Sequence, residues 1–305
     1  MAHAGSFDVY VGGSELNVAI AASHLGLSCR FVSRVPAKGL GQMIIAAAKA
    51  NGVDASDIVV SKDGRIGLYF HEFGTSQRPA SVTYDRSASA FQAVTPGEVD
   101  WGRILSGAKV FHSSGITAAL GAGALATLES GIDTAKRMNV TVSLDINYRS
   151  ALWSADACAK ALDPILRKVD VLFTSMGDLR TVLGLDAVDL HSAATALASL
   201  GVPVIAGVCN DPSYQGAPWI AQAWVRGEIV TDRRDFAVDS LDRIGAGDAF
   251  AAGFLRGYLD GEIEQALSYG TAMMALKNSM LGDYCWATMD DVNEFLFGSA
   301  TMVKR

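Results

Sequence analysis

Near-continuous apolar segments alternate with helical segments through most of this chain, and this alternation limits the possible folds more than any other feature. The apolar runs have the length of strands, and they lie at residues 109–112, 140–146, 169–174 and 202–207. The segments between them, including 121–137 and 155–167, have helical periodicity. Strands that are buried on both faces and alternate with helices predict an α/β fold, in which helices cover both faces of a mostly parallel central sheet.

Shorter extended segments lie outside this alternating region. Residues 8–13 form an extended run that ends in two glycines, and residues 59–86 alternate between apolar and polar side chains. Such segments are typical of short strands, so both are predicted to belong to a small sheet beside the main one. A hairpin is predicted for residues 219–231, around Arg226 and Gly227.

Composition narrows the classes of function. The chain has 305 residues, of which 50% are hydrophobic and 19% are charged, as expected of a protein with a large buried core. Its net charge of −7 disfavours a nucleic-acid-binding surface, which is basic. The cysteines are scattered and no His pairs recur at metal-ligand spacing, so reduced thiols in a cytoplasmic protein are predicted. No apolar run reaches the ~18 residues of a membrane span, and the first residues lack the features of a signal peptide.

Residues 239–257, with the sequence DSLDRIGAGDAFAAGFLRG, carry the strongest functional signal. The turn Gly245-Ala246-Gly247 leads into an apolar helical pattern, so several backbone amides are left unpaired at the positive end of a helix dipole. Such a helix end binds phosphate. Asp248 adds a carboxylate that can accept the proton of an alcohol during phosphoryl transfer. The alternative is that Asp248 is an ordinary N-cap and that the glycines only shape the turn.

The longer string D-R-I-G-A-G-D-A-F resembles the signature D-T-x-G-A-G-D-x-F of the ribokinase-like (PfkB) sugar kinases. The resemblance implies that Asp248 is the catalytic base and that the amides of Gly245, Ala246 and Gly247 form the anion hole. It also implies ATP as the phosphoryl donor, with nucleotide contacts at Asp242, Arg243, Gly245, Gly247 and Asn278. Arg243 replaces the threonine of the family pattern, a departure that bears on the nucleotide contacts more than on the base.

Two further segments are similar to substrate-binding elements of these kinases. Gly12-Gly13 and Asn17 match a G-G-x-x-x-N element that grips the sugar hydroxyls. Tyr69, Tyr84 and Arg86 match lid and loop positions that face the substrate in the ketodeoxygluconate kinase branch. On the residues alone, the first element is equally consistent with a capped turn, and each Tyr with an aromatic residue in the core or at its rim.

Residues 145–149 read D-I-N-Y-R and follow a predicted strand, so their polar side chains are expected at the carboxyl edge of the sheet, where ligands bind in α/β folds. The matching D-x-N-Y-R of ketodeoxygluconate kinases implies that Arg149 meets the acid group of the sugar. Arg149 and Arg86 together suit a carboxylate because each guanidinium offers paired donors in one plane. The alternative is an internal ion pair between Arg149 and Asp145 or another acid.

The resemblance also indicates where the metal and the nucleotide bind. Residues 175–178 lie where these kinases carry N-x-x-E, a pair that organises Mg²⁺ and phosphate through water, and Asp178 is accordingly assigned an indirect role at Mg²⁺. The adenine and a monovalent-cation site are expected near Asn278, Gly282 and Asp283. The loop at 210–218 replaces the K-x-G-x-x-G turn that normally borders the nucleotide, so no base contact is carried over to it.

The chain is therefore interpreted as a single ribokinase-like kinase domain over residues 1–305, with lid strands at about 8–13 and 59–86 and with a homodimer as the expected assembly. The first strand of the family's central sheet has no counterpart before Gly12. The hypothesis is ATP-dependent phosphorylation of a primary hydroxyl of a sugar acid, 2-keto-3-deoxygluconate, to its 6-phosphate. Two alternatives stay open, namely a fructokinase- or ribokinase-type enzyme for a neutral sugar and an inactive sugar- or nucleotide-binding homologue. A dinucleotide dehydrogenase is disfavoured because no early G-x-G-x-x-G follows a strand.

Overall fold

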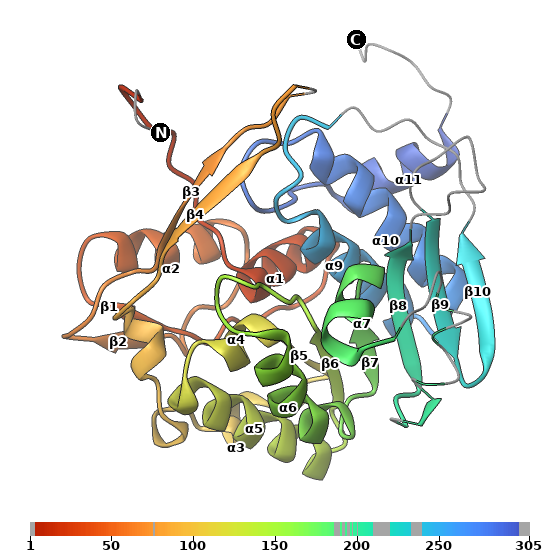
Figure 1. Cartoon of the computed structure of the whole chain (residues 1–305), viewed down its shortest axis with the longest axis horizontal. Coiled ribbons are helices and arrows are strands. Elements are labelled where there is room, and N and C mark those ends of the chain that lie inside the picture. Colours follow the sequence, from red (N-terminus) through yellow and green to blue (C-terminus); the bar gives the residue numbers. More distant parts are fainter. Residues whose placement is uncertain are drawn as a thin grey trace.

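A six-stranded sheet forms the centre of the protein, seen in a computed structural model that describes residues 4–75, 77–185, 190, 193, 196, 198–199, 201–209, 220–232 and 240–298 (Figure 1). The strands lie in the order β10-β9-β8-β7-β6-β5. Their bounds are Val110–Ser114 (β5), Thr141–Asp145 (β6), Val171–Phe173 (β7), Val204–Cys209 (β8), Ile220–Val225 (β9) and Glu228–Asp232 (β10). Strands β5 to β8 are parallel to one another, β9 is antiparallel to β8, and β10 is antiparallel to β9. The predicted mostly parallel sheet and the hairpin are confirmed.

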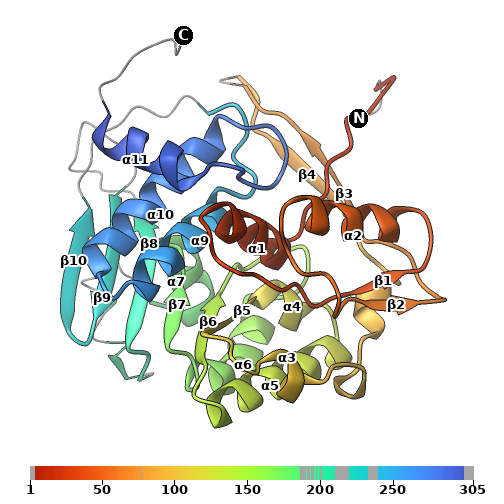
Figure 2. The same cartoon turned by 180° about the vertical axis from the view of Figure 1, so that it is seen from behind.

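Two layers of helices cover the sheet (Figures 1 and 2). One layer contains α1 (Ser14–His24), α9 (Ala246–Leu259), α10 (Ile263–Asn278) and α11 (Met289–Phe297). The other contains α3 (Trp101–Ile104), α4 (Gly115–Ala119), α5 (Ala122–Arg137), α6 (Ala155–Leu166) and α7 (Met176–Leu183). Along β7, Leu172 packs into the core of the second layer, while Val171 and Phe173 pack into the core of the first. Strands buried on both faces in this way account for the continuous apolar runs. Among the described helices, none is both long and apolar enough to cross a membrane.

The lid is a two-stranded antiparallel ribbon that projects beside the main body (Figure 1). Its strands are β3 (Leu68–Glu72) and β4 (Ser81–Asp85). A separate parallel pair consists of β1 (Arg34–Pro36) and β2 (Val59–Ser61), and α2 (Leu40–Ala50) lies between these two strands in the sequence. The segment 59–86 is therefore divided between two small sheets. Two short 3₁₀ helices, η1 (Ala90–Ala93) and η2 (Pro96–Glu98), lead from the lid to α3.

Residues 8–13 form no strand, so the prediction of a lid strand at this place is wrong. A strand forms when its backbone exchanges hydrogen bonds with a neighbouring strand, and among the described residues the 8–13 segment pairs with neither β3 nor β4. The residues Val9 and Tyr10 are 65% and 49% exposed, so their alternation is not buried against a sheet. The segment instead contacts the ribbon through Phe7, whose ring centroid lies 5.5 Å from that of Phe70.

Strand β5 lies at the edge of the described sheet, and a cavity of about 1490 Å³ extends along it. The cavity walls come from β5, α1, α5 and residues 27–35, and they include the apolar side chains of Val110, Phe111 and Leu128. The described residues contain no strand on the far side of β5. The backbone groups on that edge therefore meet no strand in the described part of the chain, a situation that favours association between sheet edges.

Candidate active site

Asp248 lies in the first turn of α9, directly after the turn at Gly245. Gly245 has a φ of 79°, which is left-handed, and a β-carbon at this position would come within 1.7 Å of the carbonyl oxygen of Asp283. The backbone conformation and the close approach therefore both require glycine. The N-cap residue of α9 is Gly245 itself, so the alternative that Asp248 is an N-cap is wrong.

Both oxygens of the Asp248 carboxylate accept hydrogen bonds from α1. The Ser14 hydroxyl donates to Oδ1 at 2.7 Å, and the side-chain amide of Asn17 donates to Oδ2 at 2.8 Å. The side-chain amide of Asn147 donates in turn to the Ser14 hydroxyl at 2.9 Å. Residues from the beginning, the middle and the end of the chain thus meet at one carboxylate. Sequence analysis found Asn17 but missed Ser14 and Asn147, although each lies within a polar string that had been singled out.

The carboxyl group of Asp248 can change protonation near neutral pH. Its pKa is raised from the ordinary value of 3.8 to about 6, mainly by burial and also by the charges of Glu15 and Asp283. The hydrogen bonds from Asn17 and Ser14 lower the pKa because they favour the ionised form. Each carboxylate oxygen can accept a second hydrogen bond, so Asp248 has acceptor sites left for a substrate hydroxyl while both donors stay bound.

The turn before Asp248 offers backbone amides of the kind expected for an anion hole. The Ala246 amide donates to the carbonyl oxygen of Arg243 at 3.2 Å. The amides of Gly245 and Gly247 have no acceptor among the described residues. These two N–H groups lie at the positive end of α9 and are therefore the donors best placed for phosphate.

Asp283 contacts the lid through Tyr69 and also lies beside two glycine-rich segments, one at Gly12 and one at Gly245. The Tyr69 hydroxyl donates to Oδ1 of Asp283. A β-carbon at Gly12 would come within 2.0 Å of Oδ2 of the same residue, so any larger residue here would displace the Asp283 carboxylate. Burial raises the pKa of Asp283, whereas the hydrogen bonds from Tyr69 and Asn17 lower it. The cavity along β5 extends to Gly12, Tyr69 and Asp283. Gly12, Asn17 and Tyr69, which were predicted to bind the sugar, thus meet at Asp283, which sequence analysis had placed near the nucleotide.

Arg86 faces the same region from the end of β4. Its guanidinium carbon lies 4.2 Å from the centroid of the Tyr84 ring. Tyr84 is directly opposite Tyr69 in the ribbon, and their ring centroids are 6.2 Å apart. Burial lowers the pKa of Arg86, and the neighbouring positive charge of Arg149 lowers it further. The Nη1 atom of Arg86 is buried and has no hydrogen-bond partner. A buried guanidinium with an unused donor beside a second arginine is an environment that favours an anionic ligand.

Arg149 lies near two carboxyl groups without forming an ion pair in the described structure. Its guanidinium is exposed and donates to the Tyr148 carbonyl oxygen at 3.0 Å. Burial raises the pKa of Asp145 well above 3.8, and the charge of Arg149 opposes this shift. Burial likewise raises the pKa of Asp178, against the hydrogen bond from Ser175 and the charge of Arg149. The alternative of an internal Arg149–Asp145 ion pair is therefore not supported, and the guanidinium stays available to a ligand.

Asp145 and Asp178 fit a Mg²⁺ ion that is held mainly by water and phosphate. The described residues contain no group of three or more His, Cys, Asp or Glu side chains that could hold a metal ion directly. Mg²⁺ at phosphoryl-transfer sites usually keeps several waters and binds one or two carboxylates together with substrate phosphates. The charges of Asp248 and Asp178 add to the effect of burial in raising the pKa of Asp145, so both carboxyl groups lie near Asp145.

Asp242 and Asn278 use their side chains inside the protein. The Asp242 carboxylate accepts hydrogen bonds from the amides of Ile244 at 3.0 Å and Gly282 at 3.1 Å. The Asn278 side chain accepts a hydrogen bond from the Ser240 hydroxyl at 2.9 Å. Both residues therefore shape the loops around the anion turn, and their nucleotide contacts stay a prediction. The loop at 210–218 lies outside the described residues.

Glu15 anchors the N-terminal end of α1 to the end of β5. Its Oε1 atom accepts hydrogen bonds at 2.7 to 3.3 Å from the hydroxyls of Ser113, Ser114 and Thr117 and from the Ser114 amide. This contact holds Gly13 and Asn17 beside the carboxyl edge of the sheet. Sequence analysis did not predict this anchor, because the partners of Glu15 are about 100 residues away.

Several known proteins are similar to this chain. Residues 1–284 match the family described as pfkB family carbohydrate kinase. The chain is 36% identical over 305 residues to the 2-dehydro-3-deoxygalactonokinase of Haloferax volcanii, with 99% of this chain and 92% of that protein covered. It is 30% identical over 286 residues to the 5-dehydro-2-deoxygluconokinase of Bacillus velezensis, with 89% and 80% covered. The solved structure of a 2-dehydro-3-deoxygluconokinase from Thermotoga maritima superposes with a TM-score of 0.90 at 31% identity, covering 97% of this chain and 92% of that one.

Proposed function

This chain belongs to the pfkB family of carbohydrate kinases, and we propose that it transfers the γ-phosphoryl group of ATP to a primary hydroxyl of a sugar acid. The proposed substrate is 2-dehydro-3-deoxygluconate (2-keto-3-deoxygluconate), and the product is its 6-phosphate. The observation that carries this proposal is the placement of Asp248. Its carboxylate has a pKa raised to about 6, it is held by two donors of α1, and it lies at the helix end that offers amides to phosphate.

In the proposed reaction the substrate hydroxyl donates a hydrogen bond to Asp248 and its oxygen attacks the γ-phosphorus. The bond between that phosphorus and the β,γ-bridging oxygen breaks, ADP leaves, and the hydroxyl proton moves to Asp248. The amides of Gly245 and Gly247, with the dipole of α9, stabilise the charge on the transferred group. Asp145 and Asp178 would hold the water shell of Mg²⁺, which neutralises charge on the nucleotide phosphates when it is bound.

The preference for an acid over a neutral sugar rests on Arg86 and Arg149. A buried donor without a partner is costly, and a substrate carboxylate would satisfy Nη1 of Arg86. The mutual repulsion of Arg86 and Arg149 would also decrease when an anion lies between them. Gly12, Gly13, Asn17, Tyr69 and Tyr84 would complete the sugar site around Asp283.

Replacing Asp248 by Asn tests the catalytic assignment. Loss of the base is expected to lower kcat by roughly 10² to 10⁴ while the KM of the sugar acid changes little. Asp260→Asn is the matched control, because Asp260 follows the opposite end of α9 and pairs with Arg256 at the surface. Turnover of the Asp248→Asn protein at the rate of that control would exclude Asp248 as the base.

A panel of substrates tests the sugar class. Purified protein with ATP and Mg²⁺ is expected to phosphorylate 2-dehydro-3-deoxygluconate in preference to ribose and fructose. The 2-dehydro-3-deoxygalactonate and 5-dehydro-2-deoxygluconate of the similar kinases belong in the same panel, because they carry the same charge; the first differs in the configuration of one hydroxyl and the second in the position of the keto group. Equal kcat/KM for a neutral sugar would contradict the two-arginine argument.

A second candidate function is binding of sugar and nucleotide without turnover. The cavity along β5 favours this alternative. Helix α1 forms part of the cavity wall, so the helix that holds Asp248 is not packed against protein on that side. This alternative predicts a rise in melting temperature with sugar or nucleotide but no ADP. Production of ADP in proportion to the sugar acid consumed would exclude it.

We also propose that the protein is a cytoplasmic homodimer that associates through the lid. The ribbon carries exposed apolar side chains, including Val82 of β4 at 38% exposure, and Phe73, directly after β3, is 48% exposed. Burial of such a surface is a common basis for association. Light scattering after size-exclusion chromatography is expected to give twice the mass of 32.0 kDa, and Val82→Glu is expected to give the monomer mass.

A further inference from the structure

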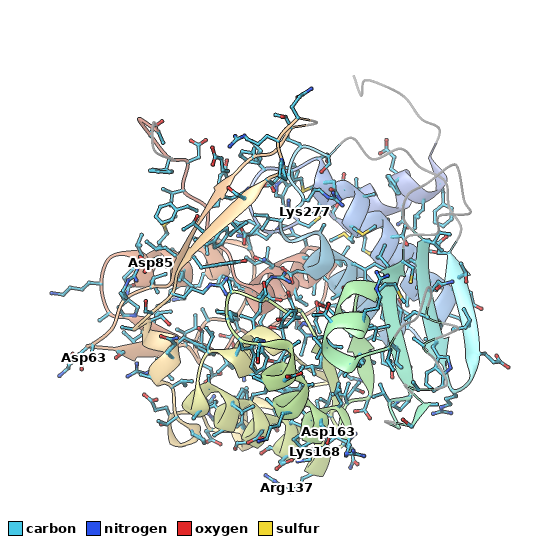
Figure 3. All side chains as sticks on the ribbon, viewed as in Figure 1. Asp63, Asp85, Arg137, Asp163, Lys168 and Lys277 are labelled. Carbon is cyan, nitrogen blue, oxygen red and sulfur yellow. The ribbon has the colours of Figure 1, made fainter. Side chains whose placement is uncertain are left out.

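Lys277 is an internal lysine in the last turn of α10, labelled in Figure 3. Its side chain is 0% exposed. The ammonium group donates hydrogen bonds to the carbonyl oxygens of Asp242 at 3.1 Å and Met280 at 2.9 Å. A buried lysine is unusual because removing an ammonium group from water costs several kcal/mol. A methionine of similar volume would fill the same space without that cost, so the packing of α10 does not explain the charge.

The two carbonyl groups belong to loops that bracket the anion turn. Asp242 lies three residues before Gly245, and its carboxylate accepts hydrogen bonds from the amides of Ile244 and Gly282. Met280 lies in the loop that leads from α10 to Asp283. The carbonyl oxygen of Asp283 lies against Gly245, at the place where a β-carbon would be. Lys277 therefore connects the loop before the anion turn, through Asp242, with the loop after α10, through Met280. The anion turn between them offers the amides of Gly245 and Gly247 to phosphate. Burial lowers the pKa of Lys277, and the charges of Asp242, Asp283 and Asp248 oppose this shift because they favour the ammonium form.

This arrangement bears on the monovalent cation that the family resemblance implies near Asn278, Gly282 and Asp283. A monovalent cation in a protein is held by several converging oxygens, mostly carbonyls, near negative charge. In this structure the carbonyl oxygens of Asp242 and Met280 converge on a cation that is part of the chain. A second positive charge beside a buried ammonium would be repelled with little screening. The residues present therefore do not fit a free monovalent cation at this place.

We propose that Lys277 is a positioning residue whose ammonium group takes the place of a monovalent cation, so that the anion turn is held in its phosphate-binding form without potassium. The residue acts through Asp242 and Met280 on the amides of Gly245 and Gly247, and does not contact the substrate. The inference rests on the proposed kinase function for its kinetic readout.

The first test uses the unmodified protein. ADP formation is measured at equal ionic strength in potassium chloride and in tetramethylammonium chloride, whose cation is too large for a carbonyl-lined site. The expected ratio of kcat/KM for ATP in the two salts is below about 1.5, and activation by potassium of fivefold or more would overturn the inference. Absence of ADP in both salts would count against the proposed function instead. In that case the melting temperature in the same two salts tests the inference. An occupied cation site would stabilise the folded state in potassium alone, so equal melting temperatures are expected and a higher one in potassium would overturn the inference.

The second test removes the ammonium group. Lys277→Met is expected to raise the KM of ATP and to lower kcat at least tenfold, with little change in the KM of the sugar. Lys168→Met is the matched control, because Lys168 is exposed and pairs with Asp133 at the surface (Figure 3). Lys277→Ala leaves a space at the two carbonyls, and ammonium or potassium ions are expected to restore its kcat several-fold. Native kcat in Lys277→Met, or no response of Lys277→Ala to either ion, would contradict the proposal.

Discussion

The hydrogen bond from Ser14 to Asp248 makes a quantitative prediction about pH dependence. In the unmodified protein the pKa of Asp248 is about 6, and its base is the ionised form, so kcat/KM should fall tenfold for each pH unit below that value. Ser14→Ala removes one donor to the carboxylate. A hydrogen bond to a charged group contributes about 1.5 kcal/mol or more, and one pKa unit corresponds to about 1.4 kcal/mol. The pKa should therefore rise by about one unit, to about 7.

The expected effect is largest at pH 6. The ionised fraction there falls from about one half to about one tenth, a loss of roughly fivefold in kcat/KM, whereas at pH 8 about nine tenths of the carboxylate is still ionised. The assay is coupled detection of ADP from pH 5 to 8.5 at saturating ATP with the sugar acid varied. The nucleotide phosphate also titrates near pH 6, but it does so equally for both proteins, so the difference between their profiles isolates Asp248.

Ser268→Ala is the matched control, because Ser268 is a buried serine whose hydroxyl donates to a helix carbonyl of α10 away from Asp248. Its profile should superpose on that of the unmodified protein. An equal loss of kcat/KM at every pH in Ser14→Ala, with the acid limb unmoved, would refute the reasoning. It would mean that Ser14 supports the local structure without stabilising the ionised base.

Three further predictions concern the same region. Arg86→Met should raise the KM of the sugar acid roughly 10- to 100-fold with little change in kcat, since the truncation removes a charged hydrogen bond, and steady-state kinetics of a neutral sugar should show no such change. Gly12→Ala should lower kcat/KM at least tenfold by displacing the Asp283 carboxylate, whereas Gly97→Ala, where nothing lies within 4 Å, should leave activity intact. Asp248→Asn should stabilise the protein at pH 7 by up to about 3 kcal/mol in urea unfolding. The sign follows because the folded pKa of about 6 exceeds the ordinary 3.8, so this group favours the folded state below pH 4 and that contribution is lost as the pH rises through 6. A difference that does not shrink between pH 7 and pH 4 would contradict this linkage.

Local patterns were sufficient for most of the secondary structure. The helix predicted from 121–137 is α5, with bounds Ala122–Arg137, and the apolar runs became the strands β5 to β8 within a few residues. Period and turn chemistry depend on neighbours along the chain, so they can be read from the sequence. The prediction for the extended run at 8–13 was wrong because strand formation depends on hydrogen bonds to a partner strand, and residues 8–13 pair with none of the described strands.

In the candidate site, too, some features follow from adjacent residues and others depend on tertiary contacts. The string around Asp248 predicted a helix that begins at a glycine turn and carries a carboxylate, because both properties follow from adjacent residues. The donors Ser14 and Asn147, the anchor at Glu15 and the internal ammonium of Lys277 were decided by the tertiary structure. Ser14 and Asp248 are 234 positions apart, and their contact exists only because α1 and α9 pack side by side on one face of the sheet. Hydrogen-bond distance and burial, which set the pKa of the base, are properties of that packing and are absent from any local stretch of the chain.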